Sequence, residues 1–173
     1  MEAYLALGSN LGNRQANLRM ALRGLTRMAV VQAVSSLYET TPQGPPQPNF
    51  YNAACRISTG LEPPALLRFL QALEQEIGRR PSAEPNSPRV IDVDILLCDD
   101  LVIDTEDLSV PHPRLPQRPF VLVPLVEIAP DAIHPTLGKS VAQLAAEAGR
   151  QGVSLIASRG WDGVAGAPHS VRL

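Results

Sequence analysis

The chain has 173 residues, of which 45% are hydrophobic and 18% charged, and its formal net charge is -2 at pH 7. This balance is typical of one globular domain and excludes an intrinsically disordered chain. A charge so close to zero argues against a broadly basic surface for nucleic acid or for an anionic membrane. No basic leader precedes the first apolar run, and no run approaches the roughly 20 apolar residues of a membrane span, so we expect a cytoplasmic protein.

The first third of the chain predicts three strands and a helix. Residues 4–7 form a short apolar run that predicts a strand. Leucine and methionine then recur at helical spacing, which predicts an amphipathic helix over residues 14–28. Two further strands are expected at residues 30–34 and 50–58, and the segment 40–49 between them is a loop rich in proline, glycine and glutamine.

The middle of the chain predicts a second helix and a fourth strand. Two prolines at 63–64 suit the first turn of a helix, whose apolar face runs to Ile77 and which Gly78 ends. Later segments predict a proline-broken loop at 79–88, a strand at 90–98, mixed strand and helix signals at 121–128, and a last short helix at 141–148.

The order of the six core elements is β-α-β-β-α-β. This order predicts an α+β fold with a ferredoxin-like βαββαβ core, in which helices lie on the faces of an antiparallel sheet. The 17 prolines gather between these elements, so we expect long, stiff loops around the functional site. We expect a single domain over residues 1–150, followed by a partly mobile tail, 151–173, with little periodicity.

Two aspartates interrupt the apolar strand predicted at 90–98. Because side chains alternate along a strand, Asp92 and Asp94 share one face, with backbones about 7 Å apart, and the apolar side chains between them share the other. A solvated sheet face would also tolerate this pair. The pair better suits a hard cation, since Mg²⁺ commonly binds one or two carboxylates together with substrate phosphates. The strand therefore predicts a magnesium–polyphosphate site.

Cations gather around the same strand. Arginine offers a planar fork of donors that suits phosphate oxygens. Two lie before the aspartates in the loop 79–88, one directly precedes the strand, and two lie beyond it near a histidine held between prolines: Arg79, Arg80, Arg89, Arg114, Arg118 and His112. Any one of them alone would be read as a surface charge. Together with the carboxylate pair they predict that a polyphosphate binds here.

Two other features bear on a ligand site. The turn Gly8-Ser9-Asn10 precedes a predicted helix, where it could hold an anion, although a tight turn explains it equally well. Phe50, Asn52 and Phe120 could hold a flat heterocycle, because an amide donates and accepts along one ring edge and phenyl faces cover the ring. Core packing is the ordinary alternative for each phenylalanine.

Five segments in order resemble one known family. They are Ala6–Gly12 (ALGSNLG), Tyr38–Pro42 with Gly44–Pro45, Tyr51–Ala54 (YNAA), Pro88–Leu96 (PRVIDVDIL) and Val110–Arg114 (VPHPR). Together they resemble 6-hydroxymethyl-7,8-dihydropterin pyrophosphokinase. The resemblance implies a ferredoxin-like fold and transfer of the β,γ-pyrophosphoryl group of ATP to the hydroxymethyl oxygen of the pterin, with AMP as the other product, in folate biosynthesis.

The resemblance also implies roles for individual residues. It assigns two Mg²⁺ ions to Asp92 and Asp94, which form the catalytic set with Arg79 and Arg89. The implied ATP contacts are Gln71, Glu74, Arg79, Arg89, Ile95, His112 and Arg118. The implied pterin contacts are Thr40, Gln43, Phe50, Asn52 and Phe120. We expect a monomer that binds ATP and the pterin and that binds neither nucleic acid nor membrane.

The catalytic loop departs from some relatives. It has Pro81, Pro85 and Asn86 where those relatives have arginines and a tryptophan, and Pro113 where a tyrosine sometimes follows the histidine. The departures bear on loop closure and rate more than on the type of reaction. Two alternatives stay open: a magnesium-dependent nucleotide hydrolase or nucleotidyltransferase that uses the same carboxylates, and a non-catalytic ferredoxin-like ligand sensor.

Overall fold

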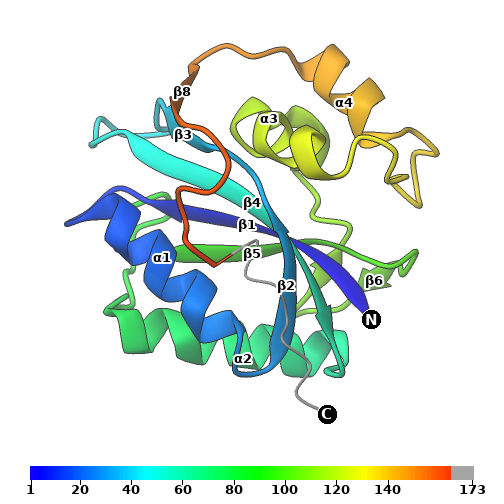
Figure 1. Cartoon of the computed structure of the whole chain (residues 1–173), viewed down its shortest axis with the longest axis horizontal. Coiled ribbons are helices and arrows are strands. Elements are labelled where there is room, and N and C mark those ends of the chain that lie inside the picture. The colour runs from blue at the N-terminus through cyan, green and yellow to red at the C-terminus, as the bar shows by residue number, and fades with distance from the viewer. Residues whose placement is uncertain (165–173) are drawn as a thin grey trace.

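The computed structural model describes residues 1–164. Within these residues the elements follow the predicted order, with additions (Figure 1). They are β1 (Glu2–Ser9), α1 (Arg14–Leu25), β2 (Ala29–Val34), β3 (Leu37–Thr40), β4 (Phe50–Thr59), α2 (Pro63–Ile77), β5 (Asp92–Cys98), β6 (Ile103–Asp104), β7 (Ser109–Val110), the 3-10 helix η1 (Leu115–Gln117), α3 (Pro119–Ile128), α4 (Val141–Ala148) and β8 (Val153–Ala157).

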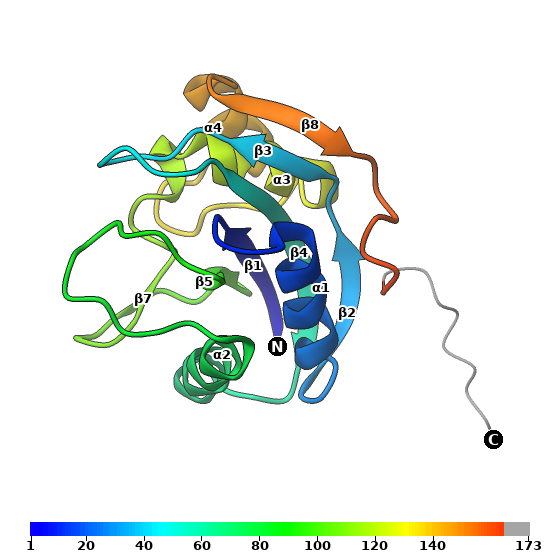
Figure 2. The same cartoon turned by 90° about the vertical axis from the view of Figure 1, so that its left-hand side faces the viewer.

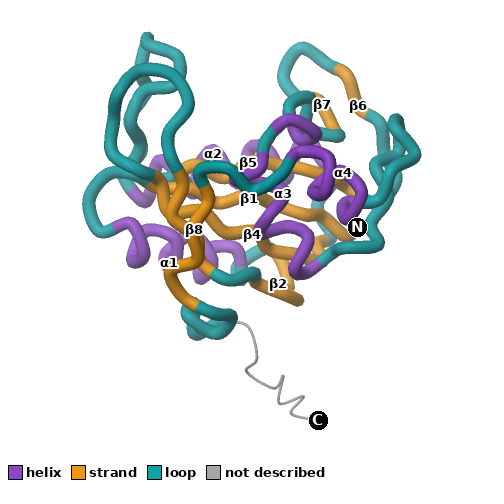
Figure 3. Tube along the Cα trace, turned by 90° about the horizontal axis from the view of Figure 1, so that it is seen from above, coloured by secondary structure: helices purple, strands orange, loops and turns teal. Residues whose placement is uncertain are grey.

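The described strands build one large antiparallel sheet. Its order is β5-β1-β4-β3-β8, and β2 also pairs with β4. The strands and helices from β1 to β5 reproduce the split βαβ topology, which confirms the predicted α+β, ferredoxin-like fold. The short β6–β7 hairpin stands apart from this sheet (Figure 3).

Helices cover both faces of the sheet, because side chains alternate along its strands. On one face α1 and α2 bury the odd-numbered side chains of β1, such as Leu5 and Leu7. On the other face α3 and α4 cover Ala54 and Leu96, with Ala6 packed beside them (Figure 1). Burying apolar surface on both faces, at about 25 cal/mol per Å², makes the sheet a rigid floor for the site.

The ambiguous segment 121–128 is helical and belongs to α3. Most of its side chains are buried, since α3 lies between the sheet and α4. A helix buried on nearly all sides shows no amphipathic period. This explains why the sequence mixed strand and helix signals there. No helix in residues 1–164 combines the length and apolar character needed to cross a membrane.

Helix ends agree with the local sequence signals, with one difference. Gly78 ends α2 with a φ of 122°, a left-handed conformation that favours glycine. The first helix ends at Leu25, three residues short of the predicted 28, because Thr26 already caps it through backbone bonds to Arg23 and Gly24. Residues 26–28 instead form the turn into β2.

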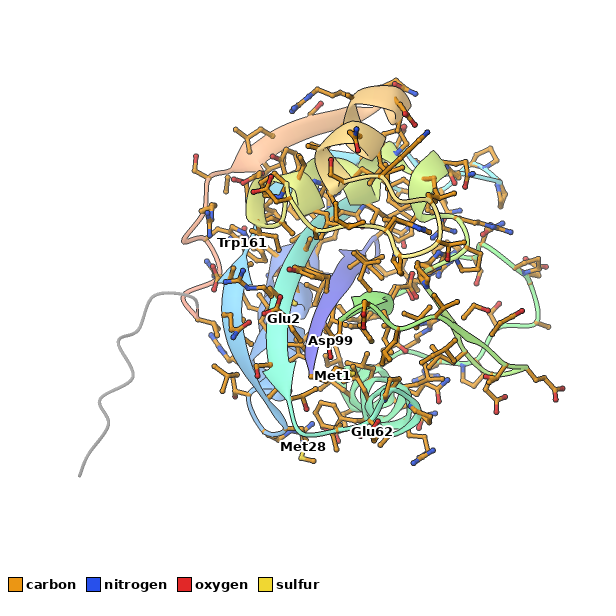
Figure 4. The ribbon with its side chains drawn as sticks, turned by 90° about the vertical axis from the view of Figure 1, so that its right-hand side faces the viewer. Met1, Glu2, Met28, Glu62, Asp99 and Trp161 are labelled. Carbon is orange, nitrogen blue, oxygen red and sulfur yellow. The ribbon has the colours of Figure 1, made fainter. Side chains whose placement is uncertain are left out.

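The segment after residue 151 differs from the expected tail. Residues 153–157 form β8, which pairs with β3 at the sheet edge. Beyond it Trp161 is 7% exposed, and its Nε1 donates to the Ser35 carbonyl at 2.8 Å (Figure 4). Ser154 and Leu155 are both exposed although they lie on opposite faces of the strand, so these five residues show no clear period. Pairing with the distant strand β3 holds them in place. The remaining part of the predicted tail, 165–173, lies outside the described residues.

Two long loops lie on the same side of the molecule. The loop 41–49 after β3 and the loop 78–91 after α2 extend in the same direction in Figure 2. Gln47 Nε2 donates to the Asn86 carbonyl at 2.8 Å, so the loops touch. They border the end of the sheet at which β1 finishes and β4 and β5 begin.

Gly24 tests how closely α1 and α2 pack. A Cβ at this position would overlap the buried Leu73 side chain. Alanine is about 1 kcal/mol more favourable than glycine inside a helix, but overpacking outweighs this. We therefore expect Gly24→Ala to lower the free energy of unfolding by about 1–3 kcal/mol, measured by urea denaturation.

Gly60→Ala is the matched control for Gly24→Ala. A Cβ at Gly60 would meet open space, so we expect a change within about 0.5 kcal/mol. An increase in stability for Gly24→Ala would contradict the close helix crossing.

Candidate active site

A cleft of 390 Å³ opens at the end of the sheet where β1 finishes and β4 and β5 begin. All its lining residues fall between Ala6 and Val121, inside the predicted domain 1–150. The floor comes from adjacent strands, and the walls come from the loops 41–49 and 78–91 and from the start of α3. A rigid floor with loop walls is a common arrangement for a binding site.

The floor is organised by one row of paired residues. Gly8 in β1 lies opposite Asn52 in β4 on one side and opposite Asp92 in β5 on the other. Paired residues of antiparallel strands point to the same face. Asn52 and Asp92 therefore face the cleft from either side of Gly8, with Cα atoms about 10 Å apart.

The neighbours of Gly8 leave no room for a side chain at this position. A Cβ on this residue would lie 2.7 Å from Asn52 Oδ1 and 3.5 Å from Phe50 Cδ1. Any other residue would displace the amide of Asn52. Gly8, which was predicted only as part of a turn, therefore also keeps the floor of the cleft free of a side chain.

The cleft brings together nearly all the residues predicted to bind ATP, metal or pterin. These are Thr40, Gln43, Phe50, Asn52, Gln71, Glu74, Arg79, Arg89, Asp92, Asp94, His112, Arg118 and Phe120. Arg80 lines a second cavity of 700 Å³ that continues along the loop 79–89. Arg114 lines neither cavity.

Ile95 is the exception, because its side chain does not line the cleft, and a contact of this residue with ATP stays a prediction. It is 5% exposed and packs in the core beneath α1 and α2. Because strand side chains alternate, the residue after Asp94 points to the opposite face of the sheet. Its side chain does not reach the cleft.

An ion-pair network holds Asp92 at the mouth of the loop 78–91. Arg79 Nη1 donates to Asp92 Oδ1 at 2.9 Å, and Arg89 Nη1 donates to Asp92 Oδ2 at 3.1 Å. Arg79 also pairs with Glu74, whose Oε2 accepts a bond from the backbone N–H of Val93 at 3.0 Å. The network thus joins α2 to the outer edge of β5.

The titration of this network follows burial and charge. Burial raises the pKa of Glu74, the positive charge of Arg79 opposes this shift, and the charge of Asp92 adds to it. Burial alone would lower the pKa of Arg79, but Asp92 and Glu74 outweigh it and raise that pKa. Arg79 therefore stays charged while both carboxylates lie against it.

Asp94 lies deeper and has an unusual acidity. Burial, and then the negative charge of Asp92, raise its pKa to about 7, while Arg118 opposes the shift. Burial also lowers the pKa of Arg118. A partly buried carboxylate beside a second carboxylate is costly without a cation, so the pair suits a divalent ion.

The donor set fits magnesium held jointly with a substrate. Within residues 1–164 no group of three or more His, Cys, Asp or Glu side chains could form a metal cage. The two carboxylates on one strand face therefore need further oxygen ligands from elsewhere. Mg²⁺ commonly completes its octahedral shell with water and substrate phosphates.

His112 is held as a neutral ring beside the carboxylates. Burial, with the nearby positive charge of Arg118, lowers its pKa to about 4. Its Nδ1 accepts a bond from the Arg114 N–H at 3.1 Å, so the neutral ring carries its proton on Nε2. The backbone N–H of His112 donates to the Leu96 carbonyl at 3.0 Å. At neutral pH His112 is therefore a hydrogen-bond donor without charge.

The other side of the cleft suits a flat ring. Asn52 is buried, and its Nδ2 donates to Thr40 Oγ1 at 2.6 Å, which fixes the amide in place. Phe50 and Phe120 also line the cleft. The Arg118 guanidinium carbon lies 5.4 Å from the Phe120 ring centroid, so the aromatic side meets the cationic side there.

The predicted turn Gly8-Ser9-Asn10 is instead the end of β1 with the residue after it, and Asn10 has a role that the sequence did not indicate. Asn13 caps α1 by accepting from the Ala16 N–H, while Asn10 connects two loops. Asn10 is 2% exposed, its Oδ1 accepts from the Arg89 N–H at 2.8 Å, and its Nδ2 donates to Gln47 Oε1 at 2.9 Å. Gln47 and Asn86 also line the cleft, and only their place in proline-rich loops hinted at this.

The raised pKa of Asp94 predicts a stability effect in the ligand-free protein. A carboxyl that titrates near 7 when folded and near 3.8 in its ordinary state binds a proton more tightly in the folded state. Its charge therefore destabilises the fold progressively as pH rises between these values. We expect Asp94→Asn to raise the Tm at pH 8 by roughly 2–8 °C, and by less at pH 5.5.

Differential scanning fluorimetry at both pH values measures this difference. Asp107→Asn, an exposed aspartate beyond β6, is the control and should leave Tm nearly unchanged at both. A Tm difference for Asp94→Asn that is absent, or that shrinks as pH rises, would contradict the burial of an uncompensated charge at Asp94.

Comparisons with known proteins agree with this geometry. The chain matches the family model described as 7,8-dihydro-6-hydroxymethylpterin-pyrophosphokinase (HPPK) over residues 4–130. It is 48% identical over 129 residues to the 2-amino-4-hydroxy-6-hydroxymethyldihydropteridine pyrophosphokinase of Bacillus subtilis, covering 73% of this chain and 77% of that protein. It is 46% identical over 135 residues to the folic acid synthesis protein FOL1 of Dictyostelium discoideum, covering 78% of this chain and 20% of that protein.

Solved structures share the fold. Plasmodium falciparum HPPK-DHPS with pteroate superposes with a TM-score of 0.71 at 16% identity, covering 84% of this chain and 44% of that one. The chain thus spans about a fifth of the FOL1 protein and less than half of the Plasmodium protein. With the family model matched across most of its length, the chain belongs to the 7,8-dihydro-6-hydroxymethylpterin-pyrophosphokinase family.

Proposed function

We propose that this protein transfers the pyrophosphoryl group of ATP to 6-hydroxymethyl-7,8-dihydropterin, giving AMP and the pterin diphosphate. The observation that carries the proposal is the row Asn52, Gly8 and Asp92 on one sheet face. It sets a place for a flat ring beside a cationic and carboxylate-lined place for phosphates. Such a cleft suits a reaction that brings a flat heterocycle to the phosphates of a nucleotide.

The phosphate side of the cleft would neutralise the negative charge of the bound ATP phosphates. Asp92 and Asp94 would hold two Mg²⁺ ions together with the ATP phosphates, and these ions supply charge neutralisation and lower the pKa of a coordinated hydroxyl. Arg79 and Arg89 lie against Asp92 and can turn to the phosphate oxygens as charge develops. These four residues are the proposed catalytic set.

The remaining ATP contacts position the nucleotide. Gln71 and Glu74 line the cleft from α2, and His112 and Arg118 line it from the segment before α3. Since neutral His112 carries its proton on Nε2, it can donate to a phosphate oxygen without adding charge. We assign to these residues the orientation of ATP rather than a proton transfer.

The pterin side orients the acceptor. Asn52, fixed by Thr40, presents an amide to the ring edge, and Phe50 and Phe120 provide apolar ring faces. Gln43 closes the cleft from the loop 41–49. In the transfer the hydroxymethyl O–H loses its proton to solvent, its oxygen bonds to the β-phosphorus, the bond from that phosphorus to the oxygen bridging it to the α-phosphate breaks, and AMP leaves with that oxygen. That the protein works as a cytoplasmic monomer stays a prediction.

Two other functions compete with this proposal. A magnesium-dependent nucleotide hydrolase or nucleotidyltransferase would use the same carboxylates and needs no pterin pocket, so AMP release that depends on the pterin separates it from the kinase. A ligand sensor of the same fold would bind without turnover. The paired aromatic and carboxylate sides of a single cleft favour the kinase.

The decisive measurement is AMP formation from ATP and Mg²⁺, with and without 6-hydroxymethyl-7,8-dihydropterin. We expect AMP only with the pterin. Asp94→Ala should lower kcat by at least 100-fold, as loss of a main electrostatic group does, and leave pterin affinity within about threefold. Exposed Asp107→Ala is the matched control. ADP or pterin-independent hydrolysis would favour the hydrolase, and ligand binding without turnover would favour the sensor.

Phe120 tests the pterin side by itself. Removing its ring takes away an apolar face, so we expect Phe120→Ala to weaken pterin binding by roughly 10- to 100-fold and to change the KM for ATP by less than threefold. Phe69→Ala is the control, because Phe69 lies on α2 outside the cleft. Unchanged pterin affinity in Phe120→Ala, measured by equilibrium titration, would remove this residue from the pocket.

A further inference from the structure

We propose that Arg14 is a positioning residue that holds the neck of the loop 41–49 and thereby sets the affinity for the pterin; this inference rests on the proposed function. The neck is where β3 ends and β4 begins, and it pairs Glu39 with Tyr51 and Thr40 with Phe50. Thr40 and Phe50 line the cleft. Glu39 and Tyr51 point to the opposite face, toward α1.

One guanidinium spans this opposite face. Arg14 Nη1 donates to Glu39 Oε2 at 2.8 Å and to the Asn49 carbonyl at 2.9 Å. Its Cζ lies 3.8 Å from the centroid of the Tyr51 ring. Arg14 therefore contacts the chain just before the loop and just after it, while lining no part of the cleft itself.

The position of Arg14 is unfavourable for the helix that carries it. It is the first residue of α1, after the cap Asn13, and the first turn has no acidic residue. The positive end of the helix dipole disfavours a cation there. Glu39 and the Tyr51 ring compensate for this by holding the guanidinium over the neck. The contacts of Arg14 therefore lie at the neck and not within its own helix.

The loop 41–49 links the geometry of its neck to the residues that line the cleft. It contains four prolines, Pro42, Pro45, Pro46 and Pro48, which fix the backbone φ at four of its nine positions and so stiffen it between its two ends. Gln43 and Gln47 sit on it and line the cleft. If the neck opens, a smaller fraction of the protein has the binding-competent arrangement. The apparent pterin affinity then falls in proportion to that fraction.

A second attachment keeps the fold intact without Arg14. The Thr41 N–H donates to the Gly152 carbonyl at 3.0 Å, and β8 pairs along β3. Variants of Arg14 therefore keep the sheet. A loss of pterin affinity in these variants would therefore report a positioning role of Arg14 and not a loss of the fold.

The experiment compares Arg14→Gln and Arg14→Lys with Arg23→Gln. Arg23 is an exposed arginine of the same helix, so its variant removes the same charge away from the neck. We expect Arg14→Gln to raise the KM for the pterin by roughly 5- to 20-fold, with kcat and the KM for ATP within twofold. Arg14→Lys should recover part of the loss, since an ammonium reaches Glu39 but lacks the planar group that stacks on Tyr51.

A double-mutant cycle and hydrogen exchange complete the test. Glu39→Gln added to Arg14→Gln should cost little more than Arg14→Gln alone, because both remove one contact. Without any substrate, amides of residues 41–49 should exchange faster in Arg14→Gln than in wild type and Arg23→Gln. This readout does not depend on turnover.

The outcomes separate the two claims. Pterin-independent or absent AMP formation by the wild-type protein would overturn the proposed function, while exchange at 41–49 would still report on the neck. Equal rises in both KM values, or unchanged pterin KM with unchanged exchange, would overturn the role of Arg14.

Discussion

The site depends on a glycine in the middle of a sheet row. Gly8 separates Asn52 from Asp92 across three adjacent antiparallel strands. Because strand spacing is fixed by backbone hydrogen bonds, the distance between the two functional sides of the cleft is a property of the sheet and not of the loops. The absent side chain leaves room for the Asn52 amide and a continuous floor. Register therefore fixes where an acceptor and a phosphate donor would meet.

Electrostatics on the phosphate side adds a second constraint. The two carboxylates that face the cleft are incompatible with each other unless cations lie near them. In the ligand-free protein Arg79 and Arg89 cover Asp92, whereas Asp94 is held closer to its neutral form by burial. The same arginines suit phosphate oxygens, so under the proposed function a polyphosphate would compete with Asp92 for them. The positive charge that balances Asp92 in the free protein would then balance the phosphates.

Much of this could be predicted from the sequence, because the signals were local. Strand alternation placed Asp92 and Asp94 on one face, and the proline pair with Gly78 bounded α2. The same alternation places the side chain of Ile95 in the core on the opposite face of the sheet. The aromatic candidates and the arginines Arg79, Arg89 and Arg118 also met at one site, although their convergence there required the βαββαβ topology.

What could not be predicted arises from long-range contacts. The strand β8 has no period of its own and exists through pairing with β3, more than 110 residues earlier in the chain. Asn10 joins Arg89 to Gln47 through one amide, and Arg14 spans a neck formed by two strands. These contacts carry no motif, since a polar side chain at a turn serves many purposes. The sequence thus specifies the chemistry on the floor of the cleft, and tertiary packing decides how its loops are held above that floor.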